Sequence, residues 1–293
     1  MKPLVKWAGG KARLAPLISE AFGGPCEGIY YEPFMGSASV FLHRKALREV
    51  QRAVLSDVNR HLMNAYREVR IDAAPVIEAL RKLPHEDWHE RYYEIRDAFN
   101  GANGVLTPVD AAAHFFWLNR ACFNGLYREN KQGMFNVPVG QYKRLSLLAP
   151  VDFWLVAQYL QDADLFGFDF KTMFSWGLSP VGDRPPVVPV PGLGDHVYLD
   201  PPYVPLSKTA NFTGYTARGF SLEDQTALAR LATYVAHRGA RVVVSNADVS
   251  LVRELYRKED GWTLQRVEVQ RSISRGPRGK VGEIIAVAGP RDD

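Results

Sequence analysis

The sequence predicts an α/β protein with a mostly parallel sheet, helices on both faces and an antiparallel hairpin at one edge. Short apolar runs alternate with helical segments along most of the chain, which is typical of parallel strands joined by helices. The last two apolar runs, residues 264–269 and 284–287, flank a basic, glycine-bearing segment and predict the hairpin. The 293 residues are 46% hydrophobic and 23% charged, a composition that excludes a disordered chain, a collagen and a coiled coil.

The first half of the chain begins with a strand, a glycine turn and a helix. A strand is expected at residues 29–31, a turn at Gly36 and an amphipathic helix from Ser39 through Leu47. A second strand at residues 53–55 ends just before Asp57.

The pattern then changes to helices that are dense in aromatic residues and arginine, followed by a stretch rich in glycine and asparagine. These features predict an inserted, mainly helical unit at residues 61–148, and a main domain formed by residues 1–60 and 149–293.

The alternation of strands and helices resumes in the second half. Strands are expected at residues 164–168, 197–199 and 241–245, with a helix at 222–237. The proline-rich stretch 177–195 predicts a loop without regular structure.

Charge and cysteine content limit the class of protein. Basic residues exceed acidic ones by 3, 4 and 4 in the windows 1–20, 120–144 and 266–280, whereas the whole chain carries only +4. This uneven distribution favours a polyanionic partner, although each window alone is also consistent with a solvated loop.

Two cysteines cannot form a disulfide scaffold or a four-thiolate zinc site. The histidines are scattered apart from His85 and His89, which are expected on a helix surface. We therefore expect no metal and a reducing, cytoplasmic location. The longest apolar stretch, near residues 111–118, contains His114, so we expect no membrane segment.

Polar residues follow three of the expected strands. They are the segment 32–36, Asp57 and the segment 200–203. In open α/β sheets, ligands bind at the carboxyl ends of the strands, where a glycine turn allows close approach and an acid commonly binds a ribose hydroxyl. The spacing is not that of a dinucleotide fingerprint, because Ala38 stands where a second glycine is expected. A packing glycine with a capping Asp57 therefore remains an alternative.

The segment Asp200-Pro201-Pro202-Tyr203 has the chemistry to hold an amine. The two prolines remove two backbone donors and leave the Asp200 carboxylate and the Pro201 carbonyl as acceptors in a rigid wall. Such a wall can hold a planar exocyclic amine by both of its hydrogens, while Tyr203 offers a stacking face. The alternative is a strand terminator with a solvent-facing aspartate.

Several motifs occur together and in order along the chain. The sequence resembles the Dam-type DNA adenine-N6 methyltransferases, which use S-adenosylmethionine, at four segments: Lys6-Trp7-Ala8-Gly9-Gly10-Lys11, Glu32-Pro33-Phe34-Met35-Gly36-Ser37, Ser56-Asp57-Val58-Asn59 and Asp200-Pro201-Pro202-Tyr203. Residues 118–143 are similar to the target-recognition segment of the members that methylate GATC, and residues 209–213 and 271–274 also match.

The resemblance implies a Rossmann-like methyltransferase fold, an inserted target-recognition domain and a set of roles. The cofactor is expected to contact Trp7, Lys11, Asp57 and Asp200 over a floor that includes Glu32, Pro33, Phe34 and Gly36. The flipped adenine is expected to lie against Asp200, Pro201, Pro202 and Tyr203.

Double-stranded DNA is the partner that the resemblance implies. The base edges are expected to contact Lys6, Leu126, Arg128, Pro138 and Tyr142. Phe123 is expected to wedge into the duplex where the family commonly has tyrosine, Asn124 to meet the base left behind and Arg120 to bind phosphate, with further DNA contacts from Asn211 and Arg271.

Three alternatives stay open at this point. The enzyme could act alone or with a cognate restriction endonuclease. A methyltransferase of an RNA base or of a protein glutamine amide would use a similar amine wall. A DNA-binding protein that has lost catalysis would keep the basic segments.

Overall fold

The computed structural model describes residues 2–175, 188–204, 220–270 and 280–290. Seven strands form one sheet in the order β3-β2-β1-β4-β5-β7-β6. The strands are β1 (Ile29–Glu32), β2 (Arg52–Ser56), β3 (Ala163–Phe166), β4 (His196–Leu199), β5 (Arg241–Ala247), β6 (Thr263–Gln270) and β7 (Lys280–Ala288). The helices are α1 (Ala15–Phe22), α2 (Ser39–Ala46), α3 (Arg60–Ile71), α4 (Ala73–Lys82), α5 (Tyr92–Phe99), α6 (Pro108–Ala121), α7 (Pro150–Leu160), α8 (Phe170–Ser175), α9 (Leu222–His237) and α10 (Ser250–Leu255), with short 3-10 turns at Phe123–Gly125 and Lys258–Asp260.

The pairing confirms the predicted mostly parallel sheet with an antiparallel edge. Strands β3, β2, β1, β4 and β5 pair in parallel. Strand β7 pairs antiparallel with both β5 and β6, so it lies between them and β6 forms the edge. The chain leaves β1 toward β2 and β3 on one side and later builds β4 and β5 on the other. The order of the strands therefore reverses between β1 and β4, which is where open α/β sheets bind ligands.

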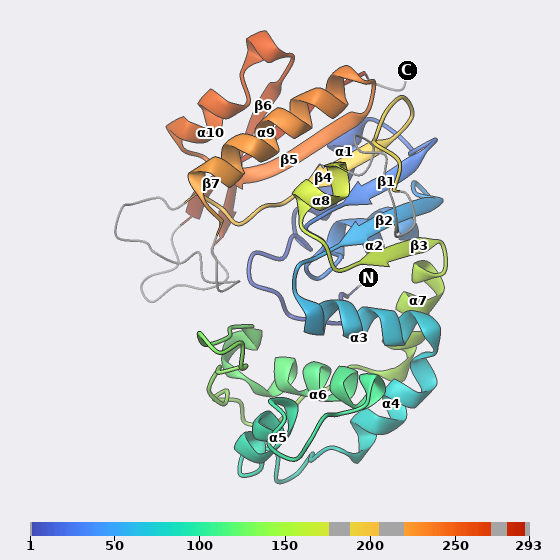
Figure 1. Ribbon diagram of the computed structural model, residues 1–293, viewed down its shortest axis with the longest axis vertical. Helices are drawn as coiled ribbons and strands as arrows, with labels where there is room; N and C mark the ends of the chain where they lie inside the picture. Colours follow the sequence, from blue (N-terminus) through green and yellow to red (C-terminus); the bar gives the residue numbers. More distant parts are fainter. Residues whose placement is uncertain (1, 176–187, 205–219, 271–279, 291–293) are drawn as a thin grey trace.

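The sheet is covered by helices on both faces (Figure 1). Successive strand residues point to opposite faces, so Tyr30 joins one apolar core with α1, α2 and α3, whereas Tyr31 joins a second core with α8, α9 and α10. All seven residues of β5 and all four of β4 are buried. Burial of both faces explains why these strands read as continuous apolar runs.

The third strand ends earlier than the expected range 164–168. Strand β3 stops at Phe166, and beyond it the Ser56 hydroxyl, which donates to the carbonyls of Phe166 and Phe168 at 3.1 Å and 2.8 Å, binds the backbone in place of a strand partner at Phe168. Asp169 then accepts a hydrogen bond from Thr172 N in the first turn of α8. A side-chain competitor of this kind is invisible in hydrophobic periodicity.

Helices α4, α5 and α6 lie beyond α3, away from the sheet (Figure 1). Their apolar residues continue the first core, with Trp117 and Tyr92 fully buried and stacked at 6.1 Å between ring centroids. After α6 the chain runs without a long helix or strand to α7, apart from two isolated bridges, Cys122–Val139 and Glu129–Phe135. Of the proline-rich stretch, the described part begins at Val188, and the Tyr31 hydroxyl donates to Pro189 O there. Within the described ranges, no helix has the length and apolar character needed to cross a membrane.

Candidate active site

The carboxyl ends of β1, β2 and β4 bring the predicted strand-end residues together. Strand β1 is paired on both sides, with β2 and with β4, so the segments that follow these three strands meet at one edge. Met35 N donates to Ser56 O at 2.9 Å, and Gly36 N donates to the Asp57 carboxylate at 3.1 Å. The turn after β1 is thus bonded to the end of β2, next to the point where the strand order reverses.

The turn after β1 depends on two residues with left-handed backbone conformation. Gly36 has φ 45°, and a Cβ at this position would lie 2.7 Å from Trp7 Cδ1. The turn and the N-terminal segment therefore approach each other more closely than any side chain would allow. Ala38, where the family commonly has glycine, also adopts φ 54°. The backbone geometry is the one for which glycine is favoured, although the residue here is alanine.

Asp57 is bonded to the turn and does not cap a helix. Its two carboxylate oxygens accept from Gly36 N, at 3.1 Å, and from Asn59 N, at 2.9 Å. The cap of α3 is instead Asn59, whose side chain accepts from His61 N and Leu62 N. Burial raises the pKa of Asp57 to about 6. An acceptor of this kind, fixed at a strand end beside a glycine turn, fits a hydroxylated ligand.

Glu32 is buried at the end of β1 and supports the same turn. Its carboxyl accepts from the Tyr30 hydroxyl at 2.8 Å and from Phe41 N at 3.2 Å. Burial raises the pKa of Glu32 to about 8, and the charge of Asp200 contributes. The carboxyl holds the start of α2 against β1. Pro33 is also buried, and Phe34 packs against Phe170 at 5.6 Å between centroids.

Asp200 is held by a buried lysine. Lys11 Nζ lies 2.9 Å from Asp200 Oδ1, with the lysine side chain 5% and the aspartate 18% exposed. The same ammonium donates to Gly9 O at 2.5 Å and lies 4.7 Å from the centre of the Tyr203 ring. Burial raises the pKa of Asp200 to about 6, although Lys11 opposes the shift. Lys11, which the resemblance places with the cofactor, thus also binds the strand-end acid.

Two buried side-chain amides, which bind each other, also bind the backbone of the segment 200–204. Gln225 of α9 donates to Pro202 O at 2.8 Å, and Asn246 of β5 donates to the Gln225 side-chain oxygen at 3.1 Å. The Asn246 side chain also accepts from Val204 N, at 3.4 Å, and from Ala247 N, at 2.8 Å. Gln225 and Asn246 are 3% and 1% exposed, so both side-chain amides are buried beneath the segment that they bind. Because prolines cannot donate backbone hydrogen bonds, the position of the segment 200–204 depends on these side-chain amides.

The Tyr203 side chain is held by a residue of β7. Its hydroxyl donates to Glu283 on β7 at 2.7 Å. The ring therefore keeps one orientation beside Lys11 and Asp200. Sequence reasoning missed Gln225, Asn246 and Glu283, and the available signal was a polar residue within an otherwise apolar buried face of a helix or strand.

The segment 118–143 lies beside the N-terminal segment. Lys6 Nζ lies 4.7 Å from the centre of the Tyr142 ring, so the first two basic windows meet, whereas much of the third lies outside the described residues. The Phe123 side chain is 42% exposed, and its backbone N–H donates to Pro138 O at 2.9 Å. Asn124 is exposed at φ 55°. An exposed aromatic ring on such a tight turn fits the predicted wedge.

The other predicted DNA contacts lie at the end of α6, on the loop that follows it, or outside the described residues. The exposed Arg128 donates to the Asn136 side-chain oxygen at 2.7 Å and to its carbonyl at 3.1 Å. Leu126 and Pro138 flank the same turn. Arg120 is half-buried and donates to Leu4 O, and its contact with phosphate stays a prediction. Asn211 and Arg271 lie outside the described residues.

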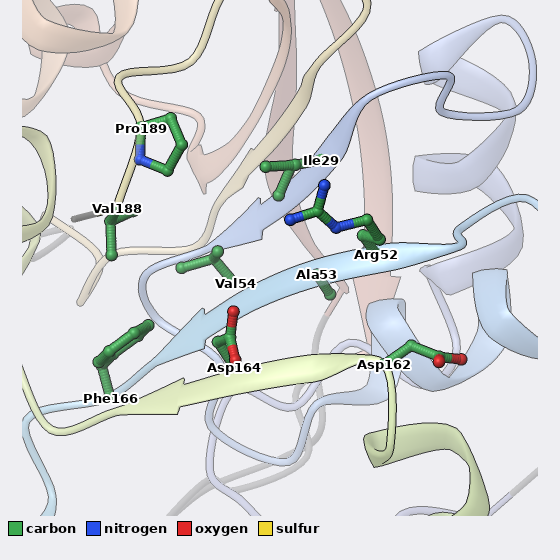
Figure 2. A pocket seen from close by; sticks show the side chains of 9 residues that line it. All are labelled: Ile29, Arg52, Ala53, Val54, Asp162, Asp164, Phe166, Val188 and Pro189. Carbon is green, nitrogen blue, oxygen red and sulfur yellow. The ribbon is translucent and has the colours of Figure 1, made fainter. Parts of the chain in front are cut away.

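A separate cavity of about 140 Å³ lies on the face of the sheet, over β1, β2 and β3 (Figure 2). It is lined by Ile29, Arg52, Ala53, Val54, Asp162, Asp164, Phe166, Val188 and Pro189. None of the predicted site residues lines it, and it is smaller than typical ligand pockets, which hold about 300 Å³ or more. Among the described residues, no cluster of three or more His, Cys, Asp or Glu side chains could hold a metal ion.

Comparison with known proteins identifies the family. Residues 7–176 and 190–273 match the family described as D12 class N6 adenine-specific DNA methyltransferases. The DNA adenine methylase of Escherichia coli K12 is 35% identical over 293 residues, which cover 99% of this chain and 96% of that protein. The type II methyltransferase M.MjaIII of Methanocaldococcus jannaschii is 33% identical over 295 residues, 96% of each chain. This chain belongs to the D12 class of N6 adenine-specific DNA methyltransferases.

Proposed function

We propose that this chain transfers a methyl group from S-adenosylmethionine to N6 of an adenine that has been flipped out of duplex DNA, within the sequence GATC. The observation that carries this proposal is the acceptor wall at Asp200 and Pro201, held by Lys11 and the buried amides where the strand order reverses. The resemblance of residues 118–143 supports GATC as the target.

The residues around the glycine turn fit S-adenosylmethionine. Gly36 permits close approach, Asp57 presents carboxylate oxygens that suit ribose hydroxyls, and Trp7 supplies an aromatic face at the turn. When bound, this cofactor supplies an electrophilic methyl carbon on a sulfonium. The D12 family implies this donor, and we assign its site to the edge formed by β1 and β2.

The wall acts on the amine through its acceptors. The N6 lone pair is conjugated with the purine ring, so the free amine is a poor nucleophile. Asp200 and the Pro201 carbonyl each accept one N6 hydrogen, which biases the nitrogen toward tetrahedral geometry and stabilises the positive charge that develops on it. Lys11 binds Oδ1 of Asp200, so we assign Oδ2 to the adenine. After transfer, one N6 hydrogen leaves as a proton.

An adenine inside the duplex cannot reach this wall. Extrusion costs a few kcal/mol, which stacking on Tyr203 and insertion of Phe123 partly offset. We assign residues 61–148 to a target-recognition domain, because the exposed ring of Phe123 and the exposed Arg128 both belong to it. A cognate restriction endonuclease as a second partner stays a prediction.

Methyl incorporation from labelled S-adenosylmethionine tests the proposal. The substrates are a duplex that contains GATC, duplexes that differ from it by one base, an RNA of the same sequence and a protein extract. We expect label in the GATC duplex alone, on N6 of adenine. Label in RNA or protein would favour the alternative substrates, and no cofactor binding by calorimetry would favour a protein that has lost catalysis.

The rate of methyl transfer should depend on the ionisation of Asp200. Its pKa is raised to about 6 by burial, and protonation removes the negative charge that stabilises the positive charge developing on N6. The single-turnover rate should therefore be constant above pH 7 and fall about tenfold from pH 7 to pH 5. The measurement uses saturating cofactor, because Asp57 also has a pKa of about 6 and affects cofactor binding. A rate that is flat down to pH 5 would contradict the role of Asp200.

Replacement of Gln225 should slow the chemical step. Gln225→Glu removes the donor to Pro202 O and places two acceptors against each other, at a cost of about 1 to 3 kcal/mol. We expect a single-turnover rate roughly ten- to a hundredfold lower with little change in the Kd of the cofactor. The control is Gln161→Glu, which removes an amide that donates to Arg70 O at the end of α7. Equal losses in both variants, or a loss confined to cofactor binding, would argue against this role of the buried amides.

A further inference from the structure

Asn119, near the end of α6, binds the backbone of two separate segments. Its side-chain oxygen accepts from Lys6 N at 2.8 Å, and its amide donates to Lys6 O at 2.8 Å and to Gly125 O at 3.2 Å. Asn119 is 4% exposed, so these bonds are shielded from water. One buried amide thus bonds both backbone groups of Lys6 and a carbonyl of the turn that carries Phe123 and Asn124.

A second observation joins the same two segments. Gly125 has φ 65°, and a Cβ on it would lie 2.4 Å from Lys6 Cβ. No other residue type fits this approach without moving Lys6. The Lys6 side chain then passes toward Tyr142, whose ring centre lies 4.7 Å from Nζ. Lys6 is therefore fixed against the turn at its backbone and at its Cβ, and its ammonium lies over the Tyr142 ring.

Lys6 lies far along the chain from the other proposed base-contacting residues. Leu126, Arg128, Pro138 and Tyr142 belong to the loop that follows α6, whereas Lys6 lies more than 100 positions earlier in the chain. The next residue, Trp7, stacks on Tyr127 at 5.8 Å between ring centroids, and atoms Cδ1 and Nε1 of its indole ring lie next to Gly36. The position of Lys6 relative to the loop therefore depends on contacts between distant segments, and Asn119 makes two of them, with Lys6 N and Lys6 O.

We propose that Asn119 is a positioning residue for sequence discrimination: it fixes the backbone of Lys6 relative to the loop 123–128, so that Lys6 meets one base pair of the target. This inference rests on the proposed function, in which Lys6 contacts a base edge. A lysine side chain has four rotatable bonds and no fixed fork, so its selectivity depends on where its backbone is held. Asn119 does not contact DNA in this proposal.

The test compares the pattern of discrimination among variants. Asn119→Asp keeps the size of the side chain and the acceptor for Lys6 N, but removes the donors to Lys6 O and Gly125 O. Single-turnover rates are measured on the preferred duplex and on the duplexes with each single-base change. We expect discrimination to fall about tenfold or more at the same base pair at which Lys6→Ala relaxes it, and to be retained at the other positions.

A second variant and a matched control separate positioning from folding. Gly125→Ala pushes Lys6 away without altering Asn119 and should relax the same base pair. Asn100 makes an equivalent pair of bonds, from Nδ2 to Phe135 O and from Phe135 N to Oδ1, both at 2.9 Å, so Asn100→Asp removes a similar clamp that does not touch Lys6. It should leave discrimination at the Lys6 base pair unchanged.

The outcomes are distinct. If Asn119→Asp and Gly125→Ala slow all duplexes by the same factor, Asn119 has only a structural role and the inference is overturned. The inference is also overturned if the two variants relax a base pair that Lys6→Ala does not. If the wild-type protein methylates no duplex, the proposed function has failed, which the wild-type assay shows before any variant is tested.

Discussion

Replacement of Asp200 by alanine should lower the rate of methyl transfer about a hundred- to a thousandfold while leaving DNA binding. The variant removes the charged acceptor for the N6 hydrogen, and loss of one preorganised electrostatic contact of this kind costs about a hundred- to a thousandfold in rate. Asp200→Asn keeps an oxygen but loses the charge, and we expect a loss of the same order. The measurements are the single-turnover rate with labelled S-adenosylmethionine and the Kd for the duplex.

Loss of the ion pair with Lys11 should also change the stability of these variants, and a second ion pair serves as the control. Lys11 is 5% exposed, so both variants leave a buried ammonium without its carboxylate and should lower the free energy of unfolding. The Lys45–Asp162 pair has a similar separation, 2.8 Å, with a lysine that is 8% exposed, but it lies at the amino end of β3. Asp162→Asn should therefore destabilise the protein without a large loss of rate. A single-turnover rate in Asp200→Ala within about tenfold of the wild-type rate would refute the assigned role.

The elements that the sequence predicted well are those that depend on local patterns. The apolar runs of β1, β4 and β5 are buried on both faces, and their expected positions agree with the structure to within two residues. The antiparallel edge was predicted from two flanking runs and is confirmed by the pairing of β6 with β7. The glycine turn was also predicted, because a strand, Gly36 and a helix follow one another within a few positions.

The residues that the sequence did not reveal act through distant partners. Asn119 binds Lys6 across 113 positions, and Gln225 reaches Pro202 only because α9 packs beside the end of β4. Asn246 and Glu283 likewise meet the segment 200–204 only through the sheet. Lys11 was predicted as a cofactor contact from its motif, but its ion pair with Asp200 could not be read from it, since motif spacing does not specify which strand end a flexible lysine reaches.

Replacement of Arg128 should relax specificity more than it weakens binding. Arg128 is exposed on the loop after α6, and Asn136 holds its guanidinium at Nε and at one terminal nitrogen. A guanidinium fixed in this way can present a planar edge to guanine, and a good bidentate pair contributes about 1 to 3 kcal/mol of discrimination. Arg128→Ala should therefore lower discrimination about ten- to a hundredfold at one base pair of the target. The measurement is the single-turnover rate on each duplex with a single-base change.

Lys131 provides the matched control for this result. It is exposed on the same loop, three positions further along the chain, and carries the same charge without a planar fork. Lys131→Ala should weaken binding to all duplexes by a similar factor and reduce the dependence of Kd on salt, since a phosphate contact releases a counterion whatever the sequence. If Arg128→Ala behaves in the same way as Lys131→Ala, Arg128 contacts the phosphate backbone, and the discrimination between base pairs must come from Lys6 and the turn at Phe123.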